Sequence, residues 1–150
     1  MSVYWDILAA VQTKVQTIPG ITITSVKIRP KPMVHKEDTL PLVVICPRKD
    51  SWEEIAELQF ENNLHIDYPV MVALIIESTF DQTGLKYQLN MRDSIRRKLF
   101  SPTLFADAIS SVFNVRYNPN PRGADTSALA SNLDPSFQEF TYRSSETRSA

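Results

Sequence analysis

Residue types that commonly carry chemistry are scarce in this chain, which contains one cysteine, two histidines and three glycines. Cys46 ends the apolar run LPLVVIC and is followed by Pro47. A thiol reacts as its thiolate, which a nearby cation or helix N-terminus stabilises and an apolar environment disfavours. Arg48 and Lys49 are close in sequence, but no Gly-rich helix start follows them. The pattern therefore favours a buried structural cysteine over a nucleophile.

The histidines, glycines and acidic residues also lack the spacing of a known site. His35 and His65 have no partner at the spacings of HxxxH or CxxC, so we expect no metal or cofactor. The glycines lie outside GxGxxG, GxxxxGK[ST] and GxSxG, the motifs of phosphate cradles and nucleophile elbows. A solvated surface is the better interpretation of Glu53, Glu54 and Glu57 than an acid–base pair. We predict that the protein is not an enzyme.

Basic residues are the remaining candidates for a binding surface. Lys27, Arg29 and Lys31 have the same parity in a predicted strand, and Arg92, Arg96 and Arg97 lie on one side of a predicted helix. We expect these two groups to contact an acidic partner or phosphate. With Arg122 the candidate protein-interaction residues are Lys27, Arg29, Lys31, Arg92, Arg96, Arg97 and Arg122. Exposed Lys and Arg also normally cover solvated faces, so a solvated face is the alternative.

The composition limits the class of partner. With 16 Lys and Arg against 17 Asp and Glu, the net charge is -1, which argues against a dedicated nucleic-acid binder. The sequence also lacks an aromatic strand of the RNP type, which would indicate recognition of nucleic-acid bases. No apolar run approaches the ~20 residues of a membrane span, and the first residues do not resemble a signal peptide. We expect a protein that is cytosolic where it is made and does not bind membranes.

Apolar spacing predicts two helices. One covers residues 3–18, with Ser2 as its N-cap and Pro19 and Gly20 after its end. Its apolar stripe consists of Tyr4, Ile7, Leu8, Val11, Val15 and Ile18. The second helix covers residues 85–100, where Tyr87, Met91, Ile95 and Leu99 recur every four residues.

The strands are predicted from alternation and from apolar runs. Residues 21–28 alternate with a change of phase near Thr24 and Ser25, which indicates a bulge or bend. LPLVVIC suits a strand covered on both faces. Ser51 and Glu54 have the spacing of a capping box, so we predict a short helical turn there. A hairpin follows, in which the strands LQF and HIDYPVMVALII are joined by a turn at residues 62–63. Pro69 places the early part of that second strand at an edge or bulge.

The last part of the chain holds two more predicted strands, SVFNVRYNP and FQEFTYRS. Phe140 and Tyr142 share a face of the second strand and are expected in the core. Residues 30–39 are predicted to form a projecting loop, and the last few residues to be flexible. The chain is therefore predicted to be one α+β domain over residues 1–150, a mainly antiparallel sheet with two principal helices on one face.

Several strings in this order resemble the small neck proteins of tailed bacteriophages. They are the N-terminal amphipathic helix, then LPLVVICP, DYPVMVALII, SIRRKLF and FTYRSSETR. The resemblance spans most of the chain, and the nearest group is the tail-terminator or tail-completion proteins.

The resemblance implies a structural virion protein that forms a ring, typically a hexamer, at the head-proximal end of the tail tube. There it would cap tube polymerisation and meet the head connector or stopper proteins, with DNA only passing through the lumen. It would reside in the virion after assembly in the host cytoplasm. A closed ring needs a heterologous interface, and loops 30–39 and 118–135 are expected to supply contacts. A head-closure or stopper protein and a small non-viral binding module are the alternatives.

Overall fold

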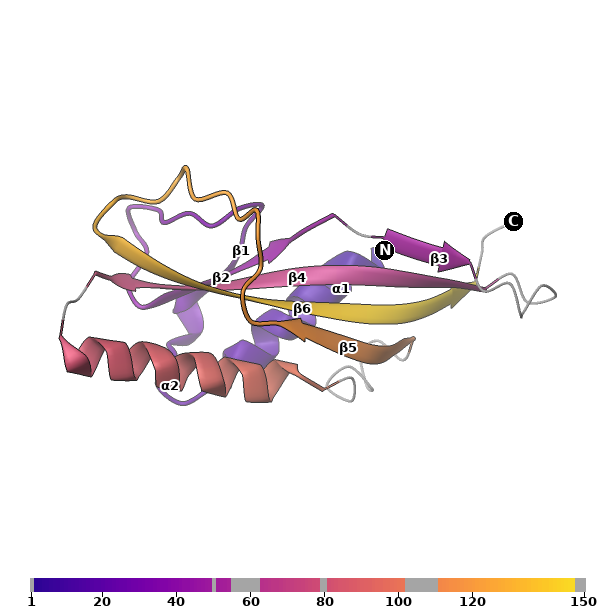
Figure 1. Cartoon of the computed structure of the whole chain (residues 1–150), viewed down its shortest axis with the longest axis horizontal. Helices are drawn as coiled ribbons and strands as arrows, with labels where there is room; N and C mark the ends of the chain where they lie inside the picture. Colours follow the sequence, from indigo (N-terminus) through magenta and orange to yellow (C-terminus); the bar gives the residue numbers. More distant parts are fainter. Residues whose placement is uncertain (1, 50, 55–62, 79–80, 102–110, 148–150) are drawn as a thin grey trace.

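Two helices cover one face of a six-stranded sheet in the computed structural model, which describes residues 2–49, 51–54, 63–78, 81–101 and 111–147 (Figure 1). The strand order is β1-β2-β4-β6-β5, and β3 pairs with β4 alongside this path. Only β1 and β2 are parallel, so the predicted α+β fold class is confirmed. In chain order the elements are α1 Val3–Val15, η1 Ile23–Ser25, β1 Val26–Ile28, β2 Leu42–Pro47, β3 Ser51–Glu54, β4 Asn63–Glu77, α2 Gln82–Leu99, β5 Val112–Asn118 and β6 Leu133–Thr147.

Both predicted helices are present, and each has a side-chain cap at its start. The Ser2 hydroxyl accepts a hydrogen bond from the Trp5 N–H of α1 at 3.3 Å. Asp81 accepts one from the Gly84 N–H at 2.7 Å, so α2 begins three residues before the predicted residue 85. Neither of these two described helices is long and apolar enough to cross a membrane.

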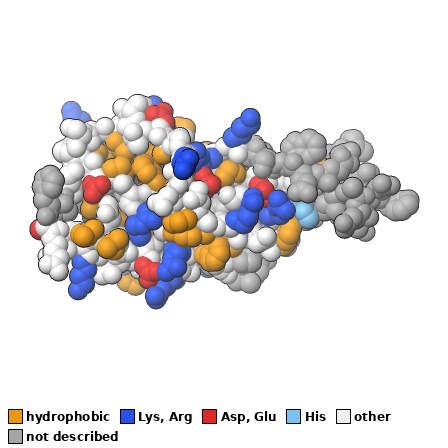
Figure 2. Space-filling view, in the orientation of Figure 1, with side chains coloured by type: hydrophobic (Ala, Val, Ile, Leu, Met, Phe, Trp, Pro, Cys, Tyr) orange, Lys and Arg blue, Asp and Glu red, His pale blue; other side chains and the backbone are white. Residues whose placement is uncertain are grey.

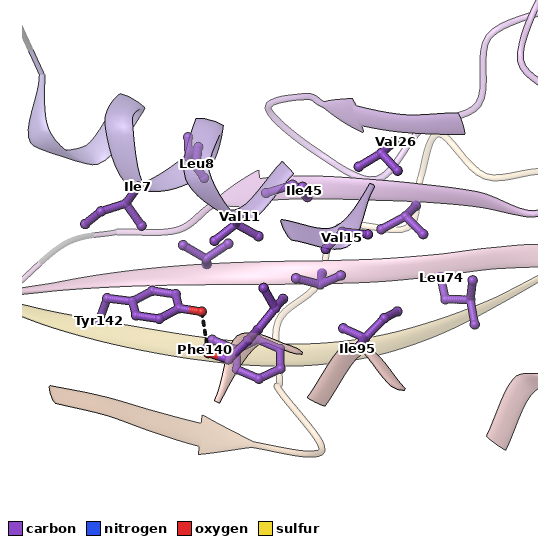
Figure 3. Close-up of a cluster of buried hydrophobic side chains, with 14 of the residues drawn as sticks. Ile7, Leu8, Val11, Val15, Val26, Ile45, Leu74, Ile95, Phe140 and Tyr142 are labelled. Carbon is purple, nitrogen blue, oxygen red and sulfur yellow. Dashed lines mark hydrogen bonds between the residues drawn. The ribbon is translucent and has the colours of Figure 1, made fainter. Parts of the chain in front are cut away.

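The main core lies between the helices and the sheet. Side chains from α1, α2 and β6 meet there, as Figure 3 shows for Val11, Ile95 and Phe140. Phe140 and Tyr142 are fully buried, as predicted. The Tyr142 hydroxyl donates a hydrogen bond to the Leu99 carbonyl at 2.7 Å and thereby fastens the end of α2 to β6.

The opposite face of the sheet is covered by two loops, residues 29–41 and 119–132. Apolar side chains of both loops pack on a second buried cluster from β2 and β4 that includes Cys46. A Lys31–Asp125 ion pair of 3.8 Å joins the loops, which lie side by side in Figure 1. The prediction that residues 30–39 project was wrong, because Val34 and Leu40 return the loop to the sheet.

The longest pairing joins β4 and β6, each of 15 residues, over their full lengths. The other edge of β4 is shared, because β3 pairs with Leu64–Asp67 and β2 with Val70–Ile75. Pro69 lies at the break between these two neighbours. The prediction that the early part of this strand lies at an edge or bulge was wrong, since β4 pairs on both sides there and its pairing with β6 has no register shift. Pro69 is tolerated because it falls where neither β3 nor β2 pairs.

Two local predictions were also wrong. The predicted strand at residues 21–28 is shorter, because β1 begins only at Val26; the bulge or bend expected near Thr24 and Ser25 is a bend, the 3-10 turn η1. Ser51 starts the strand β3 and does not cap a helical turn, because pairing with β4 decides its conformation. LQF at 58–60, Asn62 and the last three residues lie outside the described residues. The two late strands are confirmed as β5 and β6.

Tyr4 of α1 supports the sheet at the break beside Pro69. Its hydroxyl accepts a hydrogen bond from the Arg48 N–H at 2.7 Å. The hydroxyl proton can be donated to the Arg48 carbonyl, at 2.6 Å, or to the Pro69 carbonyl. Tyr4→Phe removes these bonds to part-buried backbone groups, although the Arg48 N–H keeps its hydrogen bond to the Pro69 carbonyl at 3.2 Å. We expect the free energy of unfolding, measured by urea denaturation, to fall by about 1 to 3 kcal/mol.

Tyr87→Phe is the matched control. The Tyr87 hydroxyl is buried and has no hydrogen-bond partner among the described residues, so its removal is expected to be neutral or stabilising. Equal losses in the two variants would contradict the role assigned to Tyr4.

Candidate protein-interaction surface

The structure separates the seven basic residues singled out from the sequence. Lys27 lies in β1 and is half-buried, whereas Arg29 is only 8% exposed. The Arg29 guanidinium donates to both carboxylate oxygens of Asp38, at 2.6 and 2.9 Å, and to the Met33 carbonyl at 2.7 Å. Its hydrogen bond is the main reason that the pKa of Asp38 falls to about 2. Arg29 therefore fastens the loop 29–41 within the fold.

The three arginines of α2 have different surroundings. Arg92 donates to the Ser136 hydroxyl at 2.6 Å and to the Phe137 and Pro119 carbonyls at 3.0 and 3.1 Å, which ties α2 to β6 and to the second loop. Arg96 and Arg97 are exposed and both pair with Asp93, Arg97 at 3.0 Å. The hydrogen bond from Arg96 is the largest cause of the lowered pKa of Asp93.

Arg122 lines a hollow of about 420 Å³ beside Pro69 of β4 and Glu139 of β6. Its carbonyl accepts a hydrogen bond from the Arg48 guanidinium, which also pairs with Glu139 at 3.0 Å. Gly123, with φ 76°, supports this contact, because a Cβ there would lie 3.2 Å from Nη2 of Arg48. The lining residues are Arg48, Lys49, Pro69, Asn118, Arg122 and Glu139.

A carboxylate held by two arginines continues the same face toward β3. Asp67 accepts from Nε and Nη2 of Arg143 at 2.7 and 3.0 Å, and from Nη2 of Arg116 at 2.7 Å. The Arg143 hydrogen bond is the largest of the causes that lower the pKa of Asp67. Asp67 and Arg143 are each two or four residues from Pro69 and Glu139, so strand alternation places both on the face of the hollow.

We call this area the basic sheet face. It consists of five cations and two carboxylates, namely Arg48, Lys49, Arg116, Arg122 and Arg143 with Asp67 and Glu139. Figure 2 shows Lys and Arg side chains interleaved with Asp and Glu across the side of the molecule toward the viewer. The cations outnumber the carboxylates, so the face retains positive charge to offer a partner.

Of these cations, the sequence singled out only Arg122. Within FQEFTYRS, Glu139, Thr141 and Arg143 alternate with Phe140 and Tyr142, so the polar parity of the strand was visible. The register of β6 against β4 and β5 was not visible in the sequence. This register brings together residues as far apart as 67 and 143.

Large apolar side chains are exposed on two separate elements of the helix layer. On α2, Leu85 and Leu89 are each 55% exposed one turn apart, and Phe100 follows the helix end. Trp5 is exposed in the first turn of α1, and Ile23 of η1 is exposed near the other end of that helix, where its carbonyl accepts a hydrogen bond from Gln16 at 3.2 Å. The two helices contact each other and both contact β4, and beyond that α1 packs on β1 and β2 whereas α2 packs on β6.

The residues with potential for nucleophilic or metal chemistry do not converge. Cys46 is 1% exposed, and burial raises the pKa of its thiol to about 12, so the thiol is protonated at neutral pH. The predicted place of Cys46 on a buried strand is confirmed. Among the described residues no three His, Cys, Asp or Glu side chains gather as metal ligands would.

Comparison with protein-family models and with curated proteins finds no match to this chain. The basic sheet face and the two exposed apolar patches are therefore the structural observations that bear on function.

Proposed function

We propose that the protein is a structural component of the neck of a tailed bacteriophage, a tail-terminator or tail-completion protein that assembles as a hexameric ring. In this role it has no catalytic activity. It caps the tail tube and joins it to the head connector or stopper proteins, and DNA passes through its lumen without sequence-specific contacts. The protein moves from the host cytoplasm into the virion on assembly. The order of the sequence strings that resemble this group supports the proposal.

The structural observation that carries the proposal is the pair of exposed apolar patches. A closed ring needs a heterologous contact, in which one patch of a subunit meets a different patch of the next. Leu85 and Leu89, one turn apart on α2, supply one patch, and Trp5 in the first turn of α1 supplies the other. Aromatic side chains are enriched in the centres of protein interfaces, and Trp in particular often contributes most of the binding energy.

The two loops expected to supply ring contacts are less suited to a central role. Their apolar side chains, including Val34 and Leu129, pack on the sheet of their own subunit. What they present outward is polar, for example Glu37 and Arg122. We therefore place the centre of the ring contact on the helix patches and leave the loops to its rim.

Light scattering over a range of concentrations, followed by electron microscopy of the largest species, tests the ring. We expect monomers in dilute solution, and rings or stacked rings in concentrated protein or when the tail tubes of the same phage are added. Leu85→Arg combined with Leu89→Arg is expected to abolish these rings, because two charges would be buried without partners. Thr13→Arg combined with Thr17→Arg, at two other exposed positions, is the control that should still assemble.

A two-fold dimer with an isologous interface at every concentration, and no ring when tubes are present, would contradict the proposal. That result would favour a small binding module. Rings that form equally well from the double leucine variant would show that the α2 patch is not the contact.

A further inference from the structure

The loops 29–41 and 119–132 cover only part of the sheet face that lies opposite the helices. The apolar cluster beneath them reaches Met71 on β4 and Phe137 on β6. Both strands continue past these residues, β4 back to Asn63 and β6 on to Thr147. The basic sheet face lies on this continuation, next to the loop that carries Arg122.

Strand register gathers the polar side chains of this continuation on one surface. On β6, Glu139, Thr141 and Arg143 alternate with side chains that are buried against the helices, so they point to the opposite face. The pairing of β5 sets Arg116 beside Thr141 and Asn118 beside Glu139. At about 3.3 Å per residue, the strip from Glu139 to Arg143 is about 13 Å long.

Three cations of the basic sheet face are available to a partner. Lys49 and Arg122 are exposed, and neither side chain has an ion pair with another described residue. The Arg116 side chain is 61% exposed although it pairs with Asp67. The face therefore offers an elongated, positively charged surface with about three charges free to bind anions.

The chemistry of this surface fits a nucleic-acid backbone better than a protein. Of the large exposed apolar side chains among the described residues, only Phe113 belongs to a strand, and its ring packs on that of His65. The centres of protein interfaces are depleted in charge and enriched in aromatic side chains. Protein–DNA interfaces are more polar and much more positively charged. The planar guanidinium of arginine also matches the geometry of phosphate oxygens.

We propose that the basic sheet face binds the phosphate backbone of duplex DNA and lines the lumen of the ring. The inference rests on the proposed neck function and names the surface that meets the DNA. The face lies on the other side of the sheet from the helix patches, so it does not compete with them for the ring contact. Phosphates are the same at every base pair, so the contact is independent of sequence and lets DNA slide.

Fluorescence anisotropy of a labelled duplex, titrated with dilute full-length protein, measures this contact before any ring forms. We expect a dissociation constant of about 10⁻⁴ to 10⁻⁶ M at physiological salt, equal for AT-rich and GC-rich duplexes. Each neutralised phosphate contributes about −0.9 to the slope of log affinity against log salt. Three available cations therefore predict a slope of about −3.

Lys49→Gln combined with Arg122→Gln is the test variant. It is expected to reduce the slope to about −1 and to weaken binding at low salt about tenfold or more. Lys36→Gln combined with Lys86→Gln removes the same charge from exposed positions in the loop 29–41 and on α2, and should bind DNA like the wild type. Thermal unfolding followed by circular dichroism confirms that both variants fold.

Site-specific cross-linking tests the position of the DNA. Cys46 is buried, so a cysteine introduced at an exposed position carries the accessible thiol to which a photoreactive group is attached. Asn118→Cys, at the hollow, should cross-link to duplex DNA in dilute solution and in rings assembled on linear DNA. Lys36→Cys should cross-link in neither.

Equal DNA binding by the wild type and the Lys49 and Arg122 variant would overturn the proposal, as would cross-linking from Lys36→Cys alone. If that double variant binds DNA normally but no longer forms rings, the face contacts an acidic protein surface and the DNA contact is excluded. Rings without DNA binding would overturn the inference and leave the ring intact. Salt-dependent DNA binding at this face without any ring would support the DNA contact and contradict the ring.

Discussion

Phe140→Ala is expected to lower the free energy of unfolding by about 3 to 5 kcal/mol, the range observed for fully buried aromatic side chains. Phe140 has no exposed surface and lies on β6, where the sheet meets both helices (Figure 3). Its ring is 5.1 Å from that of Tyr117, so the substitution also removes an aromatic contact with β5. Urea denaturation followed by circular dichroism measures the loss.

Phe113→Ala on β5 is the control, since it removes the same atoms from a side chain that is 47% exposed. Its partner is the ring of His65, at a centroid distance of 4.9 Å. We expect a loss of about 1 kcal/mol or less. A loss below 1 kcal/mol for Phe140→Ala would contradict the packing described for the main core.

Asp38→Ala is expected to cost about 3 to 5 kcal/mol, because it leaves the buried Arg29 guanidinium without its counter-charge. The Asp38 side chain is 1% exposed and accepts two hydrogen bonds from Arg29 and one from the His35 N–H at 2.7 Å. The loss should be accompanied by faster proteolysis within the loop 29–41. Glu37→Ala, at an exposed neighbouring carboxylate, should change neither property.

The same ion pair predicts a dependence on pH. The hydrogen bond from Arg29 lowers the pKa of Asp38 from its ordinary 3.8 to about 2, so the folded state favours the charged carboxylate. The stabilisation is complete above the unfolded pKa and is lost as the pH falls through about 2. Wild-type protein should therefore lose stability between pH 5 and 2 more steeply than Asp38→Ala does. Parallel curves would contradict the role of Asp38.

Both helices and the strands other than β3 were predictable along the chain because their signals are local. The four-residue spacing of Met91, Ile95 and Leu99 defines α2, and the apolar run before Pro47 defines β2. The errors occurred where a long-range contact overrides the local pattern. Ser51 has the spacing of a capping box, but its backbone pairs with that of Asp67 in the sheet.

The candidate surface was less predictable than the fold. Strand parity suggested that Lys27, Arg29 and Lys31 share a face, but nothing local to Arg29 shows that Asp38 folds back to bury it. The basic sheet face draws residues from β4, β5 and β6, from the segment after β2 and from the loop 119–132. Its composition follows from strand register, which a pattern of parity within one strand does not specify.

The position of β6 in the sheet has a consequence for folding during synthesis on the ribosome. β6 lies between β4 and β5, yet it is the last of the six strands to be synthesised. The apolar residues of β4, Val70 to Ile76, have to wait for their partner until more than fifty further residues have been translated. During that interval the nascent chain presents an unpaired strand edge, the feature that most readily recruits chaperones or leads to aggregation. Release of β6 from the exit tunnel is thus the step that commits the sheet to close.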